Sequence, residues 1–161
     1  MWFDMQRGSL EWASRAPLIF HNATILDATC DEVFDILADV DQWSDWFEEF
    51  EGAEWITLGT PDVGSERIVH LDIMDAREEF LAWEPGRRLS FCLKSATLPL
   101  ANWLVEDYRM TPVEGNRCSF EWDVYCQPRV FLKPLSPVLR LQFGTMFERA
   151  TNSLAKYVRQ K

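Results

Sequence analysis

The chain has 161 residues, of which 47% are hydrophobic, 26% are charged and 14% are aromatic. This length is typical of one domain that buries roughly 70% of its unfolded surface, and the apolar content excludes intrinsic disorder. A membrane span is excluded because every 18-residue stretch contains a charge, and the net charge of −10 argues against nucleic acid, or an anionic membrane surface, as the main partner.

Residues 1–17 are predicted to form an N-terminal arm, followed by a domain at 18–161. The arm mixes apolar and charged residues without a clear period and lacks the apolar core of a secretory signal.

The four cysteines, at positions 30, 92, 118 and 126, include no CxxC and no metal-ligand spacing. We therefore expect a reduced, cytoplasmic protein with core cysteines, no metal and no cofactor.

The first elements expected in chain order are a strand and two short helices. Residues 18–26 are rich in β-forming side chains and predict the strand. Thr29 followed by Glu32 forms a capping-box pattern just before apolar positions, so the first helix should begin near Cys30. A second short helix is expected over 41–47.

The next region is predicted to be a series of strands. Alternating or β-rich runs separated by turn residues are expected at 54–58, 66–72, 78–83, 89–93, 103–110 and 118–126. The final segment predicts a long helix over 136–159, with Ser136 as N-cap, Pro137 in the first turn and an apolar stripe at the helical period. Its length, about 36 Å, is enough to cross a domain.

This order of elements predicts an α+β fold. Consecutive strands joined by short turns form an antiparallel meander, and the helix must bury its apolar stripe against the concave face of that sheet. A curved sheet cannot close completely around one helix, so a ligand-sized gap between them is expected.

Charge is unevenly distributed along the chain. Residues 27–54 contain eleven acids and no Lys or Arg, whereas residues 129–161 contain seven Lys or Arg and one acid, Glu148. Two interpretations stay open: two separately solvated faces, or an acidic segment packed beside the basic terminal helix.

Residues 31–46 resemble the opening motif of the START-like (SRPBCC) superfamily, which includes polyketide cyclase/dehydrases and lipid-transfer domains. The resemblance rests on Asp31-Glu32-Val33-Phe34, the following Leu37-Ala38-Asp39 and Trp43, and continues at Val63-Gly64 and Glu84-Pro85-Gly86-Arg87. It implies a helix-grip fold, in which a curved antiparallel sheet of six to seven strands wraps a long C-terminal helix, with two short helices after the first strand. It also implies a hydrophobic cavity, but no single chemistry, because the superfamily includes carriers, cyclases, ring-hydroxylase subunits and chaperone activators.

Candidate catalytic groups must be polar residues that point into this cavity, because no nucleophile or phosphate-binding motif is present. Glu106 shares a strand face with Leu104 and Tyr108, and an inward position would raise its pKa and fit it for acid/base work. The alternative is a solvated carboxylate. Arg67 shares the buried face of its strand with Val69, and could pair with Glu106 or with an acidic group of a ligand, or extend to water.

The candidate ligand-binding residues are apolar or aromatic side chains whose phase turns them toward the gap between sheet and helix. They are Phe91, Leu93, Leu104, Tyr108, Phe120, Trp122, Phe143 and Phe147. A core role is the more common one for any single residue of this set, but as a group we expect some of them to line a cavity.

Three functional hypotheses follow. The first is a carrier or sensor that binds a hydrophobic small molecule such as a lipid, quinone or aromatic polyketide. The second is a cyclase or dehydratase, which would need two or more inward polar groups in one pocket, whereas none or one would favour the carrier. The third, weaker hypothesis is a protein-interaction module anchored by Trp2, Phe3 and Trp12. The sequence leaves a homodimer open, and it predicts no integral membrane contact.

Overall fold

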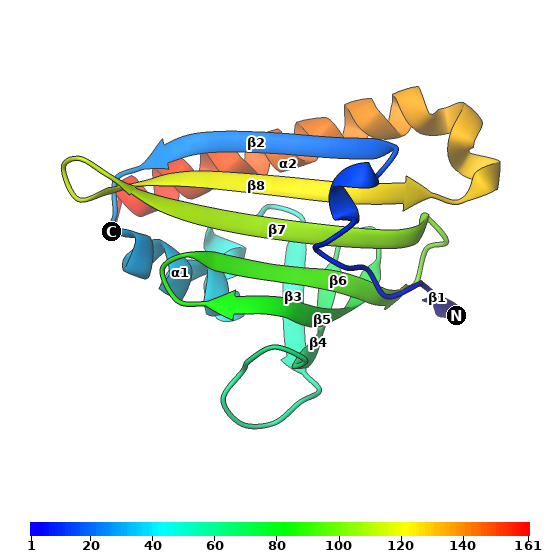
Figure 1. Cartoon of the computed structure of the whole chain (residues 1–161), viewed down its shortest axis with the longest axis horizontal. Helices are drawn as coiled ribbons and strands as arrows, with labels where there is room; N and C mark the ends of the chain where they lie inside the picture. The colour runs from blue at the N-terminus through cyan, green and yellow to red at the C-terminus, as the bar shows by residue number, and fades with distance from the viewer.

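A curved antiparallel sheet holds the C-terminal helix along its concave side in the computed structural model, which describes the whole chain, Met1–Lys161 (Figure 1). The sheet order is β2-β8-β7-β6-β5-β4-β3, with β1 paired to β6. The strands are β1 (Phe3–Asp4), β2 (Leu18–Leu26), β3 (Phe50–Trp55), β4 (Glu66–Leu71), β5 (Asp75–Glu84), β6 (Arg88–Ala96), β7 (Ala101–Val113) and β8 (Arg117–Pro128). The predicted α+β helix-grip fold is confirmed.

The two elements after β2 are the helix α1 (Cys30–Ala38) and the 3-10 helix η2 (Val40–Asp45). The capping box at the start of α1 is present: the Glu32 backbone N–H donates to Thr29 Oγ1 at 3.3 Å, and the Thr29 N–H donates to Glu32 Oε2 at 2.8 Å. The second predicted helix is therefore a short 3-10 turn that starts one residue earlier than expected.

The long helix α2 (Ser136–Arg159) has the predicted bounds, but Ser136 is not its N-cap. A 3-10 helix, η3 (Val130–Leu135), runs directly into α2, so that Leu135 occupies the cap position without a side-chain hydrogen bond. Ser136 already has helical backbone angles, and its N–H donates to the carbonyl of Lys133. The preceding 3-10 turn thus continues into α2 and gives Ser136 a helical backbone, whereas an N-cap residue has non-helical angles.

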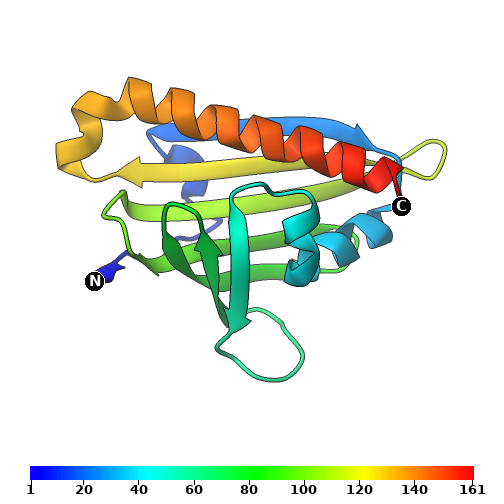
Figure 2. The ribbon, with the colours of Figure 1, turned by 180° about the vertical axis from the view of Figure 1, so that it is seen from behind.

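The sheet curls so that β3 and β4 run across the direction of β7 and β8, which leaves a concave side for α2 (Figure 2). β3 begins at Phe50, earlier than the predicted 54–58, and Ile56 to Leu58 belong to the loop that follows. A hairpin turn joins β7 to β8, and Gly115 and Asn116 in it both adopt positive φ, at 78° and 54°. α2 packs on β2 and β8 through Phe147, whose ring centroid lies 5.4 Å from that of Phe20 and 5.2 Å from that of Trp122.

The N-terminal arm lies on the outer face of the sheet, where β6 and β7 separate (Figure 1). The Met5 N–H donates to the carbonyl of Lys94 in β6 at 2.8 Å, and the Gln6 N–H donates to that of Asn102 in β7 at 2.7 Å. The arm therefore fills the gap between these strands. Its short 3-10 helix η1 (Ala13–Arg15) contributes to a second buried cluster with Ala16, Cys92, Trp103 and Val105.

The acidic segment and the terminal helix are in contact at Arg149. This residue pairs with Glu49 and lies 3.9 Å from Glu48, both of which precede β3. Of the two interpretations of the charge asymmetry, the structure supports contact between the segments at this point. No helix of the structure has the length and apolar character needed to cross a membrane.

Candidate functional site

A cavity of about 80 Å³ of water-accessible space lies between the inner face of the sheet and the first half of α2. Of its 21 lining residues, 18 are hydrophobic, so an occupant would contact mainly carbon. The sheet contributes residues such as Phe91, Leu104 and Val124, and α2 closes the other side with Phe143 and Phe147. The cavity therefore occupies the gap that the order of elements predicts.

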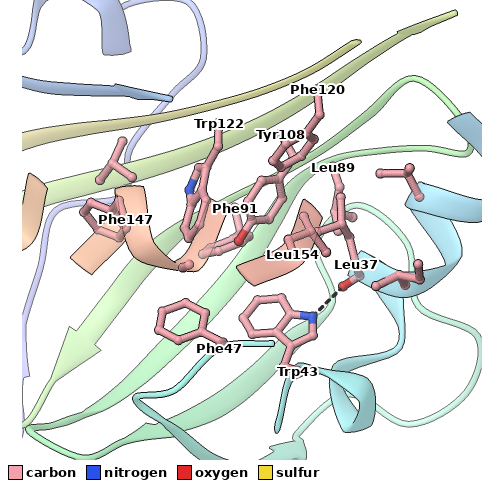
Figure 3. Packing of buried hydrophobic residues seen from close by; sticks show 14 of the residues in the cluster. Leu37, Trp43, Phe47, Leu89, Phe91, Tyr108, Phe120, Trp122, Phe147 and Leu154 are labelled. Carbon is pink, nitrogen blue, oxygen red and sulfur yellow. Dashed lines mark hydrogen bonds between the residues drawn. The ribbon is translucent and has the colours of Figure 1, made fainter. Parts of the chain in front are cut away.

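The eight candidate ligand-binding residues divide into two groups. Those that line the cavity are Phe91, Leu93, Leu104, Phe143 and Phe147. Tyr108, Phe120 and Trp122 are instead fully buried beside it (Figure 3). The Tyr108 ring centroid is 5.8 Å from that of Phe120 and 5.2 Å from that of Trp122, so these three rings pack on one another. Strand alternation identifies the inward face of β7 and β8, but not how far along a strand the cavity extends.

Glu106 lies in β7 and its side chain lines the cavity, as its position on the inward face of the strand predicts. The carboxyl is surrounded mainly by apolar side chains, and the part of it that is not covered by protein faces the cavity. The indole N–H of Trp122 donates to Glu106 Oε2 at 3.0 Å. Burial, reinforced by the charge of Glu78 and only partly opposed by Trp122 and Arg67, raises the pKa of Glu106 to about 8.

Arg67 is fully buried, but it pairs with Glu78 rather than with Glu106. Its Nε donates to Glu78 Oε2 at 2.7 Å, because the two residues stand directly opposite in the register of β4 and β5. The sequence-based pairing of Arg67 with Glu106 is therefore wrong, as is extension of the arginine to water. Burial raises the pKa of the Glu78 carboxyl, and the charge and hydrogen bond of Arg67 oppose that shift.

An aromatic cage surrounds the Arg67 guanidinium. Its central carbon is 4.7 Å from the ring centroid of Trp43, 4.9 Å from that of Phe80, 5.4 Å from that of Phe91 and 5.7 Å from that of Trp55. Nη1 and Nη2 have no hydrogen-bond partner, so the ring faces supply the remaining electrostatic stabilisation. The cage orients Arg67 toward Glu78 and fixes both residues.

Tyr108 adds an unpaired hydroxyl to this region. Burial, together with the neighbouring Glu106 charge, raises its pKa well above 10, so the phenol keeps its proton. The hydroxyl forms no hydrogen bond of normal geometry, but it lies close enough to the Glu106 carboxyl for each group to affect the pKa of the other. The polar side of the cavity thus holds a weakly acidic carboxyl and an ion pair, with the Tyr108 phenol buried beside them.

Sequence reasoning singled out only six of the 21 residues of the cavity wall, and two of those it missed, Glu78 and Trp43, carry polar groups. Glu78 lines the cavity, and its alternation with Phe80 and Ala82 in β5 was the signal that could have identified it. Trp43 also borders the cavity, and its indole N–H donates to the Leu37 carbonyl at 3.0 Å (Figure 3). This hydrogen bond holds the Trp43 ring between the cavity and Arg67.

Two carboxyl side chains, Glu78 and Glu106, therefore reach the same cavity. They are not equivalent. Glu78 is neutralised by Arg67, whereas Glu106 accepts one hydrogen bond and has no cationic partner in contact. A carboxyl with a pKa of about 8 is mostly protonated at neutral pH and can donate or accept a proton there.

Comparison with known proteins agrees with this architecture. The family model described as polyketide cyclase / dehydrase and lipid transport matches residues 19–159. Uncharacterized proteins of Mycobacterium tuberculosis and Mycobacterium bovis are 26% identical over 156 residues, which cover 96% of this chain and 93% of theirs.

Solved structures show the same fold at low sequence identity. A START superfamily protein from Mycobacterium smegmatis superposes with a TM-score of 0.74 at 11% identity, covering 88% of this chain and 97% of that one. The Zhui aromatase/cyclase from a Streptomyces species gives 0.71 at 14% identity, covering 89% and 94%. At these identities the likeness establishes the fold alone.

Proposed function

Because the chain belongs to the polyketide cyclase / dehydrase and lipid transport family, we propose that it is a carrier or sensor of one mostly apolar small molecule. The ligand class is a lipid, a quinone or an aromatic polyketide-like molecule, held between the sheet and α2. The observation that carries this proposal is the cavity wall, in which 18 of 21 residues are hydrophobic. Apolar pockets with few polar groups bind by burying area and use the polar groups for orientation.

Each Å² of apolar ligand surface that is buried contributes roughly 25 cal/mol, before the costs of association are subtracted. The open space of about 80 Å³ is smaller than the roughly 300–1,000 Å³ of a typical ligand pocket, so α2 and the sheet must separate further to admit a whole molecule of this class. Glu106 would orient the ligand. Since Trp122 occupies Oε2, the protonated Oε1 can donate a hydrogen bond to a carbonyl or hydroxyl oxygen of the ligand.

Tryptophan fluorescence during titration tests the proposal, because Trp43 lines the cavity and Trp122 lies beside it. A panel of fatty acids, quinones and flavonoid-like molecules should include one that gives a saturable change. Leu104→Trp, which fills the cavity, should abolish that change, whereas Leu58→Trp on the exposed β3–β4 loop should not. No saturable response from the panel, and no small molecule in native mass spectra of protein purified from its own host, would contradict ligand binding.

A cyclase or dehydratase is the second candidate function. Two carboxyls reach one cavity, but Glu78 is held in an ion pair with Arg67, so Glu106 is the one carboxyl there that is free to act on a ligand. One free polar group favours the carrier, and the pKa of Glu106, about 8, keeps the enzyme as the second candidate. Glu106 would be the acid/base group: as a carboxylate it would remove a proton from carbon beside a carbonyl, and as an acid it would protonate a departing hydroxyl.

Glu106→Gln separates the two functions, since the amide keeps the shape and can still accept from Trp122. In a carrier, affinity should stay within a few-fold of the wild type. In an enzyme that uses Glu106, turnover should fall by roughly 10²–10⁴ while binding persists. Turnover of a polyketide-like substrate that is unchanged by the substitution would exclude Glu106 as the acid/base group.

A further inference from the structure

An apolar segment is exposed at the end of the molecule where η3 joins α2. Its large side chains, each between 50% and 72% exposed, are Val130, Phe131, Leu135, Val138 and Leu141. η3 and the first turns of α2 extend beyond the neighbouring strands at this end (Figures 1 and 2). Contiguous exposed apolar residues of this kind mark interaction surfaces.

The local charge is opposite to that of the whole chain. No acid occurs between Asp123 and Glu148, although the chain contains 26 acids. The same interval carries Arg129, Lys133 and Arg140. Lys133 and Arg140 are exposed and form no ion pair. Arg129 is half-buried: its Nη2 donates to the backbone carbonyl of Asp4, and its guanidinium carbon lies 5.9 Å from the ring centroid of Phe3. Cations interleaved with exposed apolar side chains favour an anionic lipid interface over water or a neutral protein surface.

We propose that residues 129–141, the basic apolar segment, dock on an anionic lipid surface. The apolar side chains would enter the boundary between head groups and acyl chains, and the exposed cations Lys133 and Arg140 would contact lipid phosphates. Leu139 and Phe143, within or next to this segment, also line the cavity, so docking brings one cavity wall to the lipid. The proposal does not depend on what the cavity holds.

The net charge of −10 does not oppose this local contact. Charges beyond about 8 Å are largely screened at physiological ionic strength. Within α2 the only acid, Glu148, lies twelve residues after Ser136, about 18 Å along the helix and more than two screening lengths from the docking end. Local rather than total charge therefore decides the interaction.

Vesicle flotation of the full-length protein tests the proposal with two lipid compositions: phosphatidylcholine alone, and phosphatidylcholine mixed with phosphatidylglycerol. The wild type should bind the mixed vesicles, and binding should weaken as salt is raised. Phe131→Ser combined with Leu141→Ser should weaken binding about tenfold or more. Lys133→Gln should weaken it about fivefold, as expected for one cation near an anionic surface.

Matched controls lie elsewhere on the surface. Leu58→Ser removes an apolar side chain that is 88% exposed, and Arg15→Gln removes an exposed cation, so neither should change binding. All these positions are exposed, so folding should be unaffected. The proposal is overturned if the wild type does not bind mixed vesicles or if the segment variants bind as well as it does. It is also overturned if light scattering shows a dimer that Phe131→Ser with Leu141→Ser dissociates.

Discussion

Glu106 is the residue whose environment makes the sharpest solution prediction. Its folded pKa of about 8 lies above its ordinary value of 4.5, so between these values the folded protein binds more protons than the unfolded chain. The contribution of Glu106 to the free energy of unfolding is therefore fully present below about pH 4.5. It is lost as pH rises toward 8, at up to about 1.4 kcal/mol per pH unit.

Urea melts of the wild type and Glu106→Gln at several pH values measure this slope. The difference in unfolding free energy should grow in favour of the variant as pH increases from 5 to 8. The raised pKa of His70, which also removes stability at higher pH, is common to both proteins and cancels in the difference. Parallel profiles for the two proteins would mean that Glu106 is ionised in the folded state at neutral pH.

The Arg67–Glu78 pair makes a second prediction at the residue scale. Arg67→Met should destabilise the protein by about 3–5 kcal/mol, because it leaves the Glu78 carboxylate buried without its partner. Adding Glu78→Leu should recover most of that loss, since apolar replacement of both partners is often neutral or stabilising. Failure of the double variant to recover stability would show that the aromatic cage itself depends on the guanidinium.

At the scale of elements, α2 packs on the sheet from Met146 onward, and its first half also closes the cavity. Phe147 is 5% exposed and packs on Phe20 and Trp122, whereas Phe143 is partly exposed and borders the cavity. Phe147→Ala should therefore cost about 3–5 kcal/mol, and Phe143→Ala about half as much. Leu141→Ala, on the exposed side, should change stability by less than about 0.5 kcal/mol. Equal losses at Phe143 and Phe147 in urea melts would mean that no open space adjoins Phe143.

At the scale of the whole molecule, the N-terminal arm covers the outer face of β7, whose inner face carries Glu106. Gly8 is buried there, and a Cβ at this position would overlap the Val105 side chain. Gly8→Ala should therefore displace the arm and cost about 1–3 kcal/mol, with a red shift of tryptophan emission as Trp103 becomes exposed. Gly52→Ala, where a Cβ would lie 4.0 Å from His70, should produce no such shift. An unshifted Gly8→Ala spectrum would contradict this packing.

The sequence by itself determined the local elements and the faces that they bury. The Thr29–Glu32 capping box, the alternation of β7 and the apolar stripe of α2 are short-range signals set by backbone geometry, so each can be recognised without knowing its neighbours. These signals placed Glu106 and Phe143 toward the gap between sheet and helix, where the structure has its cavity.

Only the tertiary structure decided which inward residues meet. Arg67 faces Glu78 because of the register between β4 and β5, and bulges in β5 shift its pairing with β6. Register is a long-range property, because it depends on how the strands of the whole sheet pair and curl. The alternation of residues along one strand shows only which face of the sheet each side chain occupies. For the same reason Trp122 and Tyr108 could be assigned to the inner face, but their burial beside the cavity depends on where α2 and η2 cross the sheet.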